Sequence, residues 1–227
     1  MNSKLIAIKP AMLPVSLALA CLWALPAHAD GIDPLWAKAV EQSKNAKKWI
    51  AQDIDMELEG SESDKPAEKT KLHMHLNGWD GTKPQYQVTV LEPKSPPSKD
   101  SKGSGDMDSL LTMADNLLKP NAKVKRVDGQ TMDGKTWTVF ELRESKTVFD
   151  ITVKMWVDPE SGKLHYVDAH LRGTLMFDAD IKTNYVDTQQ FGTVAKQTDF
   201  RIDVLIPFQN AKAHVASRSS NWIARQQ

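Results

Sequence analysis

The sequence predicts a mostly β protein of the α+β class: a curved antiparallel sheet or half-open β-barrel of about eight to eleven strands, with two amphipathic helices covering its concave face. From residue 122 onward, apolar and polar residues alternate in segments of about 8 to 12 residues bounded by turn signals. Short turns between strands imply antiparallel pairing, because parallel strands need long crossovers. A sheet of this many strands must curl or close, and two segments with helical periodicity supply apolar stripes that fit against it.

The first predicted helix covers residues 34 to about 51. Asp33 is a typical N-cap, and Pro34 suits the first helical position. Small or apolar side chains then recur at helical spacing, namely Trp36, Ala39, Val40, Ser43, Ala46 and Ile50. The opposite face is cationic and polar, with Lys38, Gln42, Lys44, Lys47 and Lys48. We therefore expect an amphipathic helix whose apolar stripe lies on the sheet.

The second predicted helix is short, begins at Asp106 or Asp108 and is closed by Pro120. Its apolar face holds Leu110, Met113, Ala114 and Leu117, and is widened by Leu111 and Leu118. Together with Trp36 and Val40 of the first helix, the side chains of Leu110, Met113 and Leu117 form a predicted helical lid over the sheet.

Three strands are predicted between the two helices. Residues 54–58, 72–76 and 86–90 alternate between apolar and polar, with a hairpin at 60–65 and a turn at 79–81. Segment 92–105 (EPKSPPSKDSKGSG) has three prolines and no apolar side chain, so it is predicted to be a mobile loop. Later turns are expected at 128–129, 133–134, 158–162 and Pro207, and the clearest alternation covers 149–157, 175–185 and 200–206.

The N-terminal residues have the layout of a cleaved secretory signal peptide. Lys4 and Lys9 precede an apolar run from 11 to 25, and Ala27-His28-Ala29 is a small-residue cleavage site. The sequence therefore predicts removal of residues 1–29, a mature domain of residues 30–227, and a periplasmic location. A run of about 15 residues is too short for a membrane-spanning helix, and no second long apolar stretch follows.

Cys21 is the single cysteine, so the mature chain has no disulfide or thiolate site. A lipid-modified Cys21 is the alternative to simple cleavage. Ala18 stands where lipid-modification sites usually have leucine, and the apolar run continues past the cysteine, so this alternative is the weaker one.

The net charge and the missing motifs exclude several classes of protein. The 29 basic and 29 acidic residues balance, which argues against a nucleic-acid binder. The sequence has neither a Gly-x-Ser-x-Gly elbow nor a Gly-rich phosphate loop, so no enzyme and no cofactor is predicted. An outer-membrane barrel is disfavoured, since aromatic girdles are missing and the last residues are polar.

One histidine pair is a candidate for metal binding, and one aspartate pair is a candidate for acid catalysis. His73 and His75 share one face of a predicted strand, which makes them half of a conceivable site. The alternative is a solvent face shared with Lys71, and because no acid or third histidine lies near them in sequence, no metal site is predicted. Asp178 and Asp180 share a face and could form a catalytic acid pair, but they are interpreted as the solvent side of a strand whose apolar side is Phe177, Ala179 and Ile181.

Trp156 lies on the otherwise polar side of its predicted strand, beside Thr152 and Lys154. A tryptophan there is either covered by another element or exposed as a contact for a partner. Both interpretations stay open from the sequence, and Trp156 is the predicted partner-contact residue.

Two stretches resemble the LolA-like superfamily of periplasmic lipoprotein-sorting carriers. They are residues 133–140 (DGKTWTVF) and 154–164 (KMWVDPESGKL), and the order of elements agrees from about Trp36 to Trp222. The resemblance implies a half-open barrel whose mouth is covered by helices and whose apolar space holds acyl chains, without catalysis or cofactor. It also implies, as partners, a lipid or acylated protein and an inner-membrane exporter or outer-membrane acceptor. The chain departs from the sorting carriers at the segment 92–105, and no position matches their gating arginine.

Alternation and resemblance together predict a non-enzymatic carrier or binder of lipid or lipidated protein. The expected cavity lining is Met74, Leu76, Val88, Val90, Phe149, Ile151, Val153, Phe177 and Ile181. The alternative is an envelope module of the same fold that binds protein or senses stress. Its interior would be filled, and it would carry no lipid.

Overall fold

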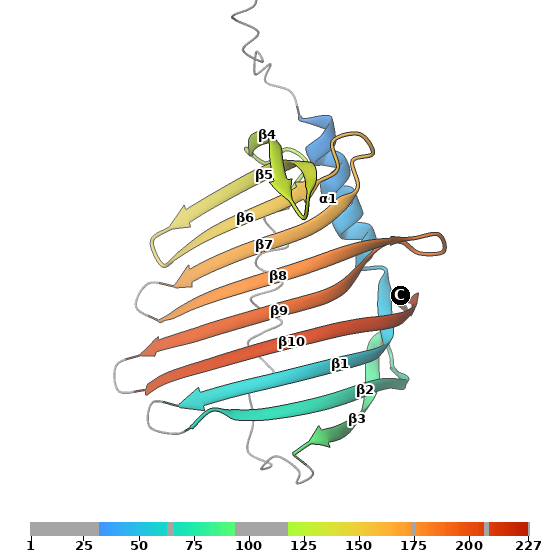
Figure 1. Ribbon diagram of the computed structural model, residues 1–227, viewed down its shortest axis with the longest axis vertical. Coiled ribbons are helices and arrows are strands. Elements are labelled where there is room, and N and C mark those ends of the chain that lie inside the picture. The colour runs from blue at the N-terminus through green and yellow to red at the C-terminus, as the bar shows by residue number, and fades with distance from the viewer. Residues whose placement is uncertain (1–31, 63–65, 94–117, 174–175, 207–208, 227) are drawn as a thin grey trace, which may run out of the picture. The chain divides into compact units, whose positions relative to one another are not determined.

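Ten β-strands and one α-helix make up the described part of the chain (Figure 1). The computed structural model describes residues 32–62, 66–93, 118–173, 176–206 and 209–226. The helix is α1 (Pro34–Ala46). The strands are β1 (Trp49–Glu62), β2 (Glu68–Asp80), β3 (Lys83–Glu92), β4 (Lys125–Met132), β5 (Lys135–Lys146), β6 (Phe149–Val157), β7 (Leu164–Gly173), β8 (Phe177–Thr188), β9 (Gly192–Ile206) and β10 (Gln209–Ala224).

The strands form one antiparallel sheet in the order β3-β2-β1-β10-β9-β8-β7-β6-β5-β4. From β4 to β10 each strand pairs with the next along the chain, as the short turns predict. β1 pairs with β10 over its whole length, from Trp49 opposite Ala224 to Glu62 opposite Ala211. The first and last strands therefore lie side by side inside the sheet, while β3 and β4 are its two open edges (Figure 1).

The predicted class and strand number are confirmed, but the predicted number of helices is not matched. The described residues contain a single helix, and residues 106–117 of the second predicted helix lie outside them. Leu118, expected at the end of that helix, is described and is not helical. It is buried in the core instead.

α1 begins where the sequence predicts. Asp33 Oδ1 accepts hydrogen bonds from the backbone N–H groups of Leu35 (2.9 Å) and Trp36 (3.2 Å), and Pro34 occupies the first turn. These bonds satisfy N–H groups that a helix start leaves without intrahelical partners. Asp33 Oδ2 also accepts from Arg126 Nη1 at 3.1 Å, which ties the start of α1 to β4.

The predicted end of the first helix near residue 51 is wrong. α1 ends at Ala46, and Trp49 and Ile50 are already part of β1, opposite Ala224 and Ile223. The backbone of residues 49–51 binds the neighbouring strand, which outweighs continued helical periodicity. Ile50 is buried as expected, although it belongs to strand β1 and not to the helix.

Two Asp-Gly pairs that look alike in the sequence fold differently. Asp133 and Gly134 both have positive φ, 52° and 73°, and form the tight turn between β4 and β5, as predicted. The turn predicted at 128–129 is wrong, because Gly129 (φ 74°) lies inside β4 where the pairing with β5 shifts register. Gly129 therefore marks a β-bulge that lets β4 continue.

The core lies between α1 and strands β5 to β9. The ring centroids of Trp36 and Phe140 are 5.5 Å apart, and Trp36 Nε1 donates to the Lys119 carbonyl oxygen at 2.9 Å. The core cluster is Trp36, Ala39, Val40, Leu118, Phe140, Leu142, Ile151, Val153, Met155, Val157, Leu164, Ala169, Leu171, Ala179, Ile181 and Phe200. One face of the sheet is thus sealed by the helix along these strands.

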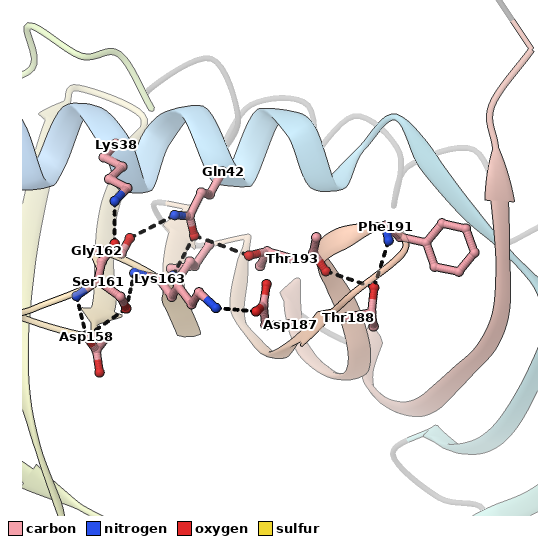
Figure 2. Close-up of polar contacts among 12 residues, drawn as sticks. Lys38, Gln42, Asp158, Ser161, Gly162, Lys163, Asp187, Thr188, Phe191 and Thr193 are labelled. Atoms are coloured by element: carbon pink, nitrogen blue, oxygen red, sulfur yellow. Dashed lines mark hydrogen bonds and ion pairs between the residues drawn. The ribbon is translucent and has the colours of Figure 1, made fainter.

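Gln42 fixes α1 to two turns of the sheet (Figure 2). Its Nε2 donates to the Gly162 carbonyl oxygen at 3.0 Å. Its Oε1 accepts from the Leu164 backbone N–H at 2.8 Å and from Thr193 Oγ1 at 3.3 Å. One amide side chain therefore joins the helix to the β6–β7 turn and to the start of β9.

The β6–β7 turn is held by internal hydrogen bonds and contacts α1 through Lys38. Asp158 Oδ1 accepts from the backbone N–H and the hydroxyl of Ser161, both at 2.7 Å, and these bonds hold the pKa of Asp158 below its usual value. The Ser161 carbonyl oxygen accepts from Lys38 Nζ (Figure 2). Gly162 has φ 70°, which favours glycine, and a Cβ there would lie 2.7 Å from Lys38 Cδ, so a larger residue would strain the turn and displace the lysine side chain.

Replacing Asp33 with alanine should lower the free energy of unfolding by about 0.5–2 kcal/mol, because the first N–H groups of α1 lose their acceptor. Asp33→Asn keeps a capping oxygen and loses only the charge facing Arg126, so its loss should be smaller. Urea unfolding of both variants measures the difference. Equal losses would mean that the ion pair, and not the cap, stabilises the start of α1.

Replacing Gln42 with alanine should cost about 1–3 kcal/mol, because the Leu164 N–H would lose its partner in a half-buried position. Gln42→Glu keeps two acceptor oxygens but cannot donate to Gly162, so it should fall between alanine and wild type. Glu41→Ala, on the exposed neighbouring position, is the control. An unchanged unfolding midpoint in Gln42→Ala would refute this role.

Candidate functional site

One face of the sheet is apolar across nearly all of its strands, and we call it the inner face because α1 packs on it. Directly opposed residues run in one line across eight strands: Leu142, Val153, Ala169, Ile181, Phe200, Val215, Leu58 and Thr70. The pairs Leu72–Val90 and Met74–Val88 extend it to β3. Since opposed residues share a face, this surface is continuous.

α1 is too short to cover the whole inner face. Its 13 residues span about 20 Å at 1.5 Å per residue. Ten strands at about 4.8 Å spacing span about 43 Å. The helix packs against β6, β7 and β9. Among the described residues, the inner face therefore has a covered half, on β5 to β9, and an open half, on β10, β1, β2 and β3.

The open half exposes apolar side chains to solvent. Val88 is 52% exposed, whereas Ile151 and Val153 of the covered half are 1% and 2% exposed. The half-buried members of the open half are Ile54, Met56, Leu58, Leu72, Met74, Leu76, Val90 and Val215. A contiguous apolar surface that still reaches water is typical of a binding surface.

The structure places all nine predicted lining residues on the inner face, in two groups. Met74, Leu76, Val88 and Val90 belong to the open half. Phe149, Ile151, Val153, Phe177 and Ile181 lie on the covered half, in the core cluster or packed against it. Of the predicted lid, Trp36 and Val40 are buried in the core, and Leu110, Met113 and Leu117 lie outside the described residues, as does most of segment 92–105.

Two strands of the open half, β1 and β10, contain none of the predicted lining residues, and β10 gives the weaker sequence signal. The inner residues of β10 are Ala211, Ala213, Val215 and Ser217, which face Val204, Ile202, Phe200 and Thr198 of β9. Alanine and serine side chains differ little in hydrophobicity from the residues next to them, so the apolar–polar alternation of β10 is weak in the sequence. Its pairing with β1 and β9 is what shows that β10 belongs to the surface.

The other face of the sheet, the outer face, carries the polar residues of each strand. Trp156 lies there, half-buried, with its ring 5.1 Å from that of Tyr166 at an interplanar angle of 65°. Burial raises the pKa of Tyr166 to about 12, with a contribution from the Asp168 carboxylate. Partner contact at Trp156 remains a prediction.

Histidines of the outer face are paired with aspartates of neighbouring strands. His73 Nδ1 lies 2.8 Å from Asp55 Oδ1, and His75 Nδ1 lies 2.6 Å from Asp53 Oδ1. The hydrogen bond with His75 is the main cause of the lowered pKa of Asp53. Acids that lie about 20 positions away in the sequence thus come next to these histidines, because β1 pairs with β2. Such exposed pairs contribute little to stability.

A second outer-face group has the residue types of a metal site. His170 Nδ1 lies 3.0 Å from Asp180 Oδ1 and 3.5 Å from Asp178 Oδ1. One ligand atom from each of the three residues falls within 4.8 Å of the others, so they could hold a divalent cation. Arg172 Nε lies 3.8 Å from Asp178 and competes for its carboxylate.

Within the described residues, no helix is both long and apolar enough to cross a membrane. The predicted signal peptide and Cys21 lie outside those residues. Secretion and the periplasmic location therefore remain predictions from the sequence.

Comparisons with known proteins give two structural likenesses. No protein-family model matches the chain, and no curated protein does. A DUF1329 family protein from Desulfovibrio piger is 13% identical with a TM-score of 0.36, covering 85% of this chain and 92% of its own. A LolA superfamily protein from Nitrosomonas europaea is 10% identical with a TM-score of 0.32, covering 83% and 94%. The superfamily that residues 133–164 resemble is thus also represented among similar structures, although at these scores neither likeness assigns a family or a function to the chain.

Proposed function

We propose that this protein is a non-enzymatic carrier or binder of lipid or lipidated protein that holds acyl chains on the inner face of its sheet. The supporting observation is that the apolar inner face continues for four strands beyond the helix-covered half. Its side chains there are half-buried, and Val88 is 52% exposed. An acyl chain laid on this open half would complete the burial that α1 provides elsewhere.

The driving force would be burial of apolar area. Each methylene removed from water contributes about 0.8 kcal/mol, so a 14-carbon chain could gain roughly 10 kcal/mol before the costs of ordering. The open half suits chains of varied shape, since Met56 and Met74 are unbranched and adaptable. Binding driven by burial of apolar surface requires neither a catalytic group nor a cofactor.

The predicted signal peptide sets the proposed location and partners. A periplasmic carrier would take its lipid or acylated protein from the inner membrane and deliver it to an acceptor at the outer membrane. The lipid or acylated protein would cover the open half of the inner face during transfer.

An envelope protein-binding or stress-sensing module is the second candidate. It is favoured by the filled core of the covered half and by the half-buried Trp156–Tyr166 pair on the outer face. This candidate requires no acyl binding, so a lipid-binding measurement separates the two.

Val88→Glu should weaken binding of a fluorescent fatty acid at least about tenfold, because a charge would enter the apolar surface. The same substitution at Thr89 is the matched control, since Thr89 is exposed on the opposite face of the same strand. Neither variant should change the unfolding midpoint greatly, as both positions reach solvent. Displacement by phospholipid or a lipopeptide measures the affinity, and mass spectrometry of lipid extracted from natively purified protein identifies the cargo.

Two outcomes would overturn the lipid-binding proposal. One is wild-type protein that binds no acyl probe at micromolar concentration. The other is equal loss of binding in the Val88 and Thr89 variants. Either result would favour the protein-binding module, with Trp156 as its contact.

Intact mass of the protein purified from the envelope should correspond to residues 30–227, beginning at Asp30. Such a chain has no cysteine, so a reducing agent should leave its thermal unfolding unchanged. A mass that includes residues 1–29, or a diacylglycerol group on Cys21, would contradict the predicted processing.

A further inference from the structure

A pocket lies where α1 ends, outside the surface assigned to acyl chains, and we call it the rim pocket. Its volume is about 420 Å³, within the range of small-ligand sites. It is lined by Gln42, Asn45, Lys48, Trp49, Lys163, Asp187, Phe191, Gly192 and Thr193. These residues come from α1, the start of β1, the end of the β6–β7 turn and the β8–β9 hairpin, several of which Figure 2 shows together.

The rim pocket belongs to the same face of the sheet as the apolar surface. Gln42 and Asn45 of the pocket wall belong to α1, which packs on the inner face. Thr193 is directly opposite Asp187 in β9, and its hydroxyl binds Gln42 of α1. The pocket therefore lies at the ends of the strands, between the inner face and the helix.

Its wall combines an aromatic pair with hydrogen-bonding groups. The rings of Trp49 and Phe191 lie 5.0 Å apart at an interplanar angle of 60°. The backbone N–H of Phe191 donates to Thr188 Oγ1 at 3.0 Å, which fixes the hairpin that carries the ring (Figure 2). A Cβ built on Gly192 meets no atom within 4 Å, so the hairpin leaves open space beside the rings.

The charges of the rim pocket favour an anion. Lys163 Nζ is paired with Asp187 Oδ2, so these two charges offset each other. Lys48 also lines the pocket, and its ammonium group forms no ion pair with any other described residue. The helix C-terminus adds only a partial negative charge, about half of an elementary charge, against the full positive charge of Lys48. The cationic helix face noted in the sequence thus borders this pocket.

The two surfaces are close enough to hold one amphiphile. β9 and β2 are three strands apart, about 14 Å at 4.8 Å per step. One leaflet of a bilayer is about 15 Å of hydrocarbon, half of the 30 Å core. Strand β1 begins at Trp49, which lines the pocket. Four residues later, Asp53 is opposite His75 of β2. Leu76, the next residue of β2, therefore lies near the same end of the sheet as the pocket.

We infer that the rim pocket binds the oxyanion headgroup, phosphate or carboxylate, of an amphiphile whose acyl chain lies on the open half. This inference rests on the proposed function and specifies its ligand as anionic. Lys48 supplies the charge, Asn45 and Thr193 supply polar contacts, and the Trp49–Phe191 wall contacts the apolar part next to the headgroup.

Calorimetry below micellar concentration with dodecyl phosphate and dodecyltrimethylammonium tests the inference, because the two share one chain and differ in headgroup charge. Wild type should bind the phosphate at least about tenfold more tightly. Lys48→Glu should abolish this preference, whereas Lys44→Glu, on an exposed position of the same helix that does not line the pocket, should keep it. The indole N–H resonance of Trp49, assigned with Trp49→Phe, should shift with dodecyl phosphate in wild type.

The remaining outcomes separate the two proposals. Equal affinity for both amphiphiles would overturn the headgroup site and leave acyl binding intact. Binding of neither would overturn the proposed function and this inference with it. If inorganic phosphate alone binds as tightly as dodecyl phosphate, the pocket is a free-anion site and the lipid headgroup is excluded.

Discussion

Within the described residues, the arrangement depends on a difference in size: a ten-stranded sheet with one apolar face is covered by a single helix of 13 residues. The helix reaches about half of the roughly 43 Å that ten strands occupy. Where it lies, Trp36 and Val40 complete a dry core with Phe140 and Ile151. Where the helix does not cover the sheet, the same alternation of apolar and polar residues leaves Val88 and the apolar side chains next to it in contact with water. A packed half and an open half thus follow from one strand pattern.

The position of α1 is determined by directional contacts at its ends and middle. Asp33 caps the helix and pairs with Arg126 of β4, while Gln42 binds the β6–β7 turn and β9. Apolar packing alone would allow the helix to slide along a surface of similar side chains. Hydrogen bonds to Gly162 and Leu164 select one position, and they leave the rim pocket at the helix C-terminus.

The two faces of the sheet suit different tasks. The outer face is covered with charged pairs such as His75–Asp53 and His214–Asp199, which keep it hydrated and contribute little to stability. The inner face ends in a pocket with an aromatic wall and a lysine. An apolar surface bordered by a cationic pocket is complementary to an anionic amphiphile, which is why we connect the open half and the rim pocket in one ligand.

The sequence by itself determined the β class, the antiparallel meander and which side of each strand is apolar, because alternation and turn residues act within a few positions of one another. It therefore placed Met74, Val88 and Ile151 on one face. It could not decide that Asp53 would stand beside His75, that Gly129 would form a bulge, or that Trp49 would leave the helix for β1. Those outcomes depend on pairing between residues up to 175 positions apart, as in Trp49 with Ala224. Only the tertiary structure decided how far α1 covers the inner face, since coverage depends on where the helix is anchored and not on its own periodicity.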